Sequence, residues 1–138
     1  MKVIWSAAGA RSGNLLTTAA ICSNHGSIPG TIGARFYEYN GTLVCTIAFG
    51  GVLPGETRTL AVDPITSMSN GQTCSGAPVL HQGRIELYAN TNETLKFDCT
   101  AMLIDMAGNP PQSMTRLTLY SGTGVFPGDI IFADGIDP

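Results

Sequence analysis

Cysteine and histidine lie close together at one point of the sequence. Cys22 and His25 form a C-x-x-H pair, which could supply a thiolate nucleophile with its base or half of a metal site. Cys74 and His81 carry the same groups elsewhere in the chain. A thiol-dependent hydrolase using Cys22 and His25 is one alternative function, and it requires these groups to converge in a pocket. The structural interpretation is a buried strand cysteine and a turn histidine.

Metal and cofactor motifs are missing from the sequence. Asp129, Asp134 and Asp137 offer carboxylates near the end of the chain, but their spacing does not fit a calcium-binding loop. The chain also lacks a glycine-rich phosphate loop, an H-E-x-x-H motif and a G-x-S-x-G motif. We therefore expect no catalytic residues, no cofactor and no bound metal.

Two tyrosines are the candidate ligand-binding residues. Tyr37 and Tyr39 lie two positions apart in a strand-like segment, so both rings are expected on the same face of the sheet. Exposed aromatic rings of this kind can stack on sugars, and a carbohydrate-binding module is a further alternative function. Aromatic side chains that only stabilise the sheet are the structural interpretation.

The elements that must position these residues are strands. Short runs rich in Thr, Val, Ile and Tyr alternate with turn residues, which is typical of β-structure. Asn40-Gly41 lies between two such runs and predicts a tight hairpin. Strands are predicted at 15–22, 31–39, 42–49, 56–62, 83–88, 95–105 and 115–120.

This spacing predicts an all-β protein with a two-layer antiparallel β-sandwich of about seven strands, immunoglobulin-like in type. A closed barrel is the alternative. A single domain covers residues 1–138, with its core at about 15–120 and a C-terminal tail at 121–138. Residues 63–78 are expected to form a long loop. The apolar trio at 130–132 in the tail could pair along a sheet edge or reach a neighbouring subunit.

Composition and charge exclude several kinds of partner. The chain of 138 residues has 12% charged residues and a formal net charge of −3. Its cations are scattered, so no nucleic acid is expected as a partner. No apolar run is long enough for a membrane span, and the chain as given shows no signal peptide. So few charges leave apolar surface to be covered, which favours a homo-oligomer.

Four cysteines, Cys22, Cys45, Cys74 and Cys99, allow three disulfide pairings. Free thiols buried in the core are equally compatible with the sequence, because disulfides need an oxidising compartment. The localisation is left open.

Several short motifs resemble those of a group of small, uncharacterised bacterial β-sandwich proteins. They are Cys22-Ser23-Asn24, Pro54-Gly55-Glu56-Thr57, Gly83-Arg84-Ile85, Cys99-Thr100-Ala101 with Asp105, Pro110-Pro111, and Met114 with Leu117. The resemblance spans about residues 15–120 and implies the sandwich fold, with no assigned activity. Cys45 and Cys74 lie outside this pattern, so they could form a second disulfide or remain a pair of free thiols.

Within this resemblance, Cys22 and Cys99 are expected to approach each other, because a central cysteine pair often links the two layers of an immunoglobulin-like sandwich. The function favoured by the sequence is a non-enzymatic binding or assembly module that associates with itself. Its ligand and its other partners are left open.

Overall fold

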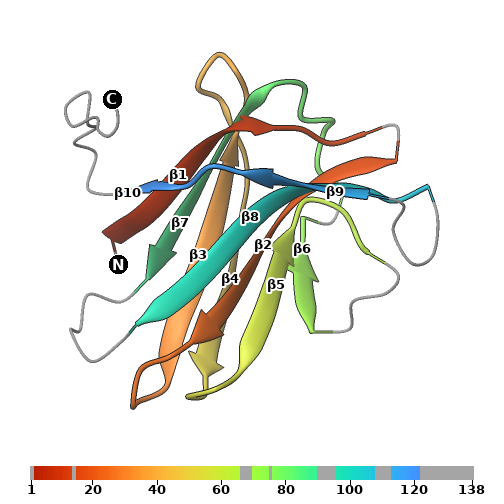
Figure 1. The fold of residues 1–138 in the computed structure, drawn as a ribbon. Helices are drawn as coiled ribbons and strands as arrows, with labels where there is room; N and C mark the ends of the chain where they lie inside the picture. Colours follow the sequence, from red (N-terminus) through yellow and green to blue (C-terminus); the bar gives the residue numbers. More distant parts are fainter. Residues whose placement is uncertain are drawn as a thin grey trace.

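The computed structural model is an all-β molecule in which two five-stranded sheets pack face to face (Figure 1). It describes residues 2–13, 15–65, 70–74, 76–89, 96–107 and 113–121, and none of these forms a helix. The β1 sheet has the order β10 (Tyr120–Ser121), β1 (Lys2–Ala10), β7 (Gly83–Ala89), β3 (Gly30–Tyr37), β4 (Leu43–Val52). The β2 sheet has the order β6 (Gly71–Thr73), β5 (Thr57–Ala61), β2 (Leu16–Asn24), β8 (Phe97–Asp105), β9 (Ser113–Leu117). The predicted two-layer sandwich is confirmed.

Seven of these strands correspond to the predicted ones, and β1, β6 and β10 are additional. The core begins earlier than the predicted residue 15, since β1 contributes the buried Ala7 and Ala10. Within the predicted loop 63–78, residues 71–73 form β6, which pairs in parallel with β5. The other strand pairings are antiparallel. The segment lacks apolar residues at these positions, so its sequence gave no strand signal.

Alternating apolar side chains from both sheets fill the space between the layers. Ile32, Ala34 and Phe36 on β3 are fully buried, as are Ile85 and Leu87 on β7. These side chains lie at alternate positions along each strand, which share one face of the sheet. The β2 sheet completes this core with Ala20, Cys22, Leu60, Phe97, Cys99 and Ala101.

The two long sides of the sandwich are closed in different ways. On one side, the chain leaves the β2 sheet at β9 and joins the β1 sheet at β10, which pairs with β1. Leu117 and Leu119 of this crossing pack against the core. On the other side, a disulfide joins Cys45 of β4 to Cys74, which follows β6.

A smaller apolar cluster covers the outer face of the β2 sheet. Ala19, Ala61 and Ile104 are buried there against Ile65, which follows β5. Met102 and Met106 pack at its margin. β8 therefore contributes side chains to apolar clusters on both faces of the sheet.

Candidate functional site

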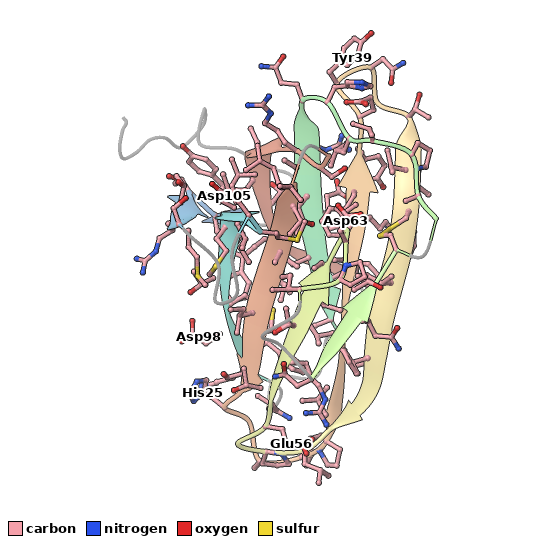
Figure 2. All side chains as sticks on the ribbon, turned by 90° about the vertical axis from the view of Figure 1, so that its right-hand side faces the viewer. His25, Tyr39, Glu56, Asp63, Asp98 and Asp105 are labelled. Carbon is pink, nitrogen blue, oxygen red and sulfur yellow. A yellow bond between two sulfur atoms is a disulfide. The ribbon has the colours of Figure 1, made fainter. Side chains whose placement is uncertain are left out.

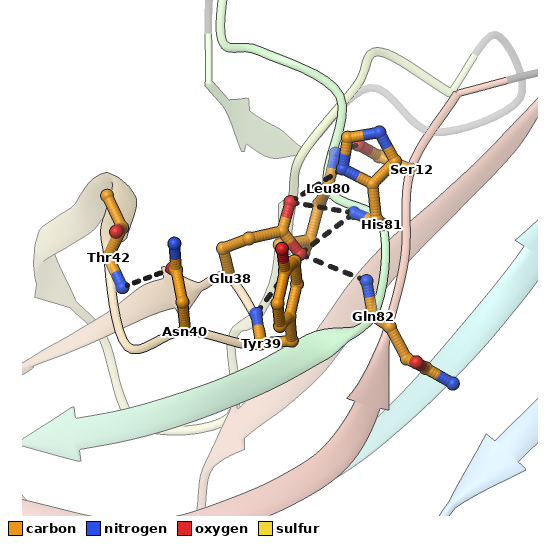
Figure 3. A network of polar contacts seen from close by, with 8 residues as sticks. All are labelled: Ser12, Glu38, Tyr39, Asn40, Thr42, Leu80, His81 and Gln82. Atoms are coloured by element: carbon orange, nitrogen blue, oxygen red, sulfur yellow. Dashed lines mark hydrogen bonds and ion pairs between the residues drawn. The ribbon is translucent and has the colours of Figure 1, made fainter.

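A polar network lies at the end of the sandwich where β3 turns into β4 (Figure 3). The Glu38 carboxylate accepts hydrogen bonds from the backbone amides of His81 (3.1 and 3.0 Å), Gln82 (3.0 Å) and Tyr39 (3.1 Å). The His81 Nδ1 atom lies 2.8 Å from Glu38 Oε2. Glu38 thereby ties the segment before β7 to the end of β3.

The backbone amides that surround this carboxylate set its charge. Those of Gln82 and His81, followed by the His81 ring and the Tyr39 amide, lower the pKa of Glu38 from 4.5 to about 2, although partial burial opposes the shift. A carboxylate with so low a pKa is a poor general base near neutral pH. The network suits structural support better than proton transfer.

Two further contacts fix the same end of the molecule. Ser12 and Leu80 exchange hydrogen bonds: the Leu80 amide donates to Ser12 Oγ (2.8 Å), and the Ser12 amide donates to the Leu80 carbonyl (2.7 Å). A Cβ atom on Gly83 would fall on the carbonyl group of Tyr37. The segment before β7 can therefore approach β3 this closely only with glycine at position 83.

The C-x-x-H pair is not assembled as a thiol and a base. Cys22 is buried and bonded to Cys99, whereas the His25 side chain is 63% exposed and its Nε2 atom lies 3.9 Å from Asp98 Oδ2. Figure 2 shows His25 and Asp98 together at the end of the sandwich opposite to Tyr39. All four cysteines are in disulfides, which leaves neither Cys22 nor Cys74 as a nucleophile for His25 or His81.

The predicted approach of Cys22 and Cys99 is confirmed, with their Cα atoms 4.1 Å apart. The link is within one sheet, however, because Cys22 and Cys99 are register partners on β2 and β8. The expected link between layers is made instead by Cys45 and Cys74, whose Cα atoms lie 6.1 Å apart. The sequence could not choose this pairing, because it depends on which edges of the two sheets meet.

The two tyrosines occupy different environments. Tyr37 lies at the end of β3 beneath the guanidinium of Arg84, which is 4.0 Å from the ring centre. Tyr39 lies beyond the strand, in the turn, and is 74% exposed. Sugar stacking at this pair stays a prediction, and Tyr39 is the ring that is open to solvent.

The edge strand β4 is a candidate binding surface that carries no sequence motif. Its ten residues contain no charged residue and no proline, and β3 is the strand with which it pairs in the described part of the chain. Its core-facing Cys45, Ile47 and Phe49 are only partly buried, whereas their partners on β3 are fully buried. The lack of charge in Leu43–Val52 is visible in the sequence, but its place at a sheet edge is not.

The described residues hold no group of three or more His, Cys, Asp or Glu side chains suited to a metal ion. The acids Asp129, Asp134 and Asp137 lie outside these residues. Within the same part of the chain, no helix is long and apolar enough to cross a membrane.

Fold and site together define an all-β sandwich whose layers are joined by a disulfide and whose polar network supports its loops. No family model matches the chain, and no curated protein matches it. A solved structure of FlgD from Xanthomonas campestris, described in terms of hook capping essential for flagellar assembly, is similar at 15% identity and a TM-score of 0.33. The match covers 87% of this chain and 68% of FlgD. A similarity of this size carries no argument about function.

Proposed function

We propose that this protein is a non-enzymatic, immunoglobulin-like assembly module that associates with copies of itself. The observation that carries the proposal is the β4 edge: ten uncharged residues whose core-facing side chains stay partly exposed. An edge strand presents unpaired backbone N–H and C=O groups, and natural proteins usually protect such edges.

In the part of the chain that the structure describes, the other three sheet edges carry the usual protection. β6 and β10 have three and two residues, and the five-residue β9 carries the exposed Arg116. Short length and positive charge both discourage strand addition. β4 has neither feature, which supports a role for this edge in binding another polypeptide.

The disulfides support an oxidising compartment for this module. Disulfides persist in secreted, periplasmic and cell-surface proteins, and they are rare in a reducing cytosol. All four cysteines pair within one copy, so we expect self-association to be noncovalent. The proposed setting is the outside of the cell or the periplasm.

Sedimentation velocity of the full chain over a wide concentration range tests the proposal. We expect the mean mass to rise with concentration in a solution without reductant, where both disulfides stay intact. A sharp monomer peak at the highest concentration would contradict self-association.

A further inference from the structure

The space beside β4 suits one added strand better than a second folded copy. Figure 1 shows β5 and β6 extending to the right past β4, and β4 contacts both strands across the core. An antiparallel pair of β4 strands from two copies would be related by a two-fold axis perpendicular to the sheet. That symmetry would bring the two projecting β6 strands into the same region, whereas a single extended segment avoids the conflict.

The position also sets the chemistry of the added segment. The Cys45–Cys74 disulfide occupies one part of the edge, which leaves about residues 46–51 for pairing. Alternate apolar side chains on the added strand would cover Ile47 and Phe49, which the molecule leaves partly exposed. The segment should therefore be short, extended, and uncharged between its ends.

The chain itself contains a segment of this kind outside the described residues. Residues 129–134 have the sequence Asp-Ile-Ile-Phe-Ala-Asp, with Ile130 and Phe132 at alternate positions. Pro127-Gly128 precedes the segment, and Gly135 follows it.

In the sequence, this segment follows β10, which lies at the edge of the sheet opposite to β4. β10 ends at Ser121, which pairs with Trp5 of β1, while β4 is the other edge of the five-stranded order. The eight residues between Ser121 and Ile130 can span up to about 26 Å when extended. This separation between the start of the donor segment and β4 favours the β4 edge of a neighbouring molecule as the acceptor.

We propose that residues 129–134 of one copy add as a strand beside β4 of another copy. This inference rests on the proposed self-association and identifies the two surfaces that meet. Because the donor segment and the acceptor edge are different surfaces, the contact is head-to-tail and can repeat from copy to copy. Main-chain hydrogen bonds would give affinity, and the partly exposed Ile47 and Phe49 would favour apolar side chains at alternate positions of the added strand.

Two variants of the full chain test the donor segment and the acceptor edge independently. The donor variant combines Ile130→Lys with Phe132→Lys, and the acceptor variant is Ile47→Lys, which places a charge among the partly exposed core-facing residues. Each charge should weaken association at least about tenfold. Thr115→Lys on the exposed β9 edge is the matched control, and thermal unfolding of every variant checks that it is folded.

Sedimentation of each variant alone and of an equal mixture gives the decisive result. We expect both variants to be monomeric alone, and the mixture to form a one-to-one pair that grows no further, since it holds one working donor and one working acceptor. The inference would be overturned if either variant assembled like the parent chain, or if the mixture stayed monomeric. Neither of these results would contradict self-association of the parent chain. A parent chain that is itself monomeric would instead overturn the proposed function.

Discussion

Among single residues, Glu38 shows how one side chain can hold a loop without being visible as a motif. It is an isolated acid in the sequence. Its three amide donors come from the adjoining turn and from residues more than forty positions away. Only the tertiary structure brings these groups together, so no local pattern in the sequence distinguishes Glu38 from the other acids.

The depressed pKa of Glu38 predicts a specific dependence of stability on pH. A carboxyl group whose pKa is lowered by folding stabilises the folded state fully above its ordinary value, and loses that contribution as pH falls toward the folded-state pKa. For Glu38 this window runs from 4.5 down to about 2. We expect Glu38→Gln to lower Tm near neutral pH, and its difference from the parent chain to shrink as pH falls through that window.

Thermal unfolding followed from pH 7 to pH 2 measures this difference. Asp98→Asn is the control, because the Asp98 side chain is 79% exposed and its Oδ2 atom lies 3.9 Å from the Nε2 atom of the exposed His25. A Glu38→Gln variant with the same Tm as the parent chain at pH 7 would show that the network adds nothing to stability.

For the strands, the sequence predicted most where large and polar side chains alternate. The inward faces of β3 and β7 were predictable because Ile, Phe and Leu alternate there with Arg, Glu and Tyr. β1 was missed because five of its nine residues are Ser, Ala or Gly, and such residues carry little periodicity. Its place in the sheet depends on pairing with β7 and β10.

A substitution at Gly83 tests whether the close approach between the start of β7 and the end of β3 matters for stability. A Cβ atom at this position would fall on the Tyr37 carbonyl, so Gly83→Ala should push the start of β7 away from β3. We expect a loss of about 2 kcal/mol or more in the free energy of unfolding, because the obstacle is backbone and cannot rotate aside.

Denaturant unfolding of Gly83→Ala beside Gly50→Ala measures this effect. The atom nearest a Cβ at Gly50 is Thr31 Oγ1 at 3.8 Å, and Gly50 has an ordinary backbone conformation. Gly50→Ala should therefore leave stability nearly unchanged. Equal effects of the two substitutions would contradict the role of the close approach.

In the molecule as a whole, the pattern of strands and turns predicted the two layers, whereas the connections between them were not predictable. Cys22 and Cys99 fall in strands whose central place was expected, and they meet within the β2 sheet. Cys45 and Cys74 join the layers, because β4 and β6 are edge strands on the same side of the sandwich. Which edges coincide depends on how the sheets are stacked, and no local pattern records it.

The two disulfides should differ in what they contribute. They are separated by 77 and 29 residues in sequence, and loop-closure entropy predicts losses of about 4.5 and about 3.6 kcal/mol on their removal. We expect Cys22→Ala with Cys99→Ala to destabilise the chain more than Cys45→Ala with Cys74→Ala. The second pair of substitutions should instead speed amide hydrogen exchange mainly in β4 and β6.

Denaturant unfolding and hydrogen exchange of both double variants test this order. Intact mass after alkylation without reductant provides the control, because no thiol of the parent chain should react. If replacing Cys45 and Cys74 sped amide hydrogen exchange evenly over both sheets, their disulfide would not act mainly on β4 and β6.

Trp5 is the single tryptophan of the chain, and its place in β1 gives the molecule a built-in optical probe. Its partly buried ring packs against the core, and its backbone pairs with Leu87 on one side and Ser121 on the other. Fluorescence should therefore register separation of the margin where β9 crosses to β10, and should respond much less to loosening at the disulfide-linked margin. Trp5 emission would follow the opening of the first margin, and a titration of newly exposed thiols would follow the opening of the disulfide-linked margin. Recording both during unfolding would show which side of the sandwich opens first.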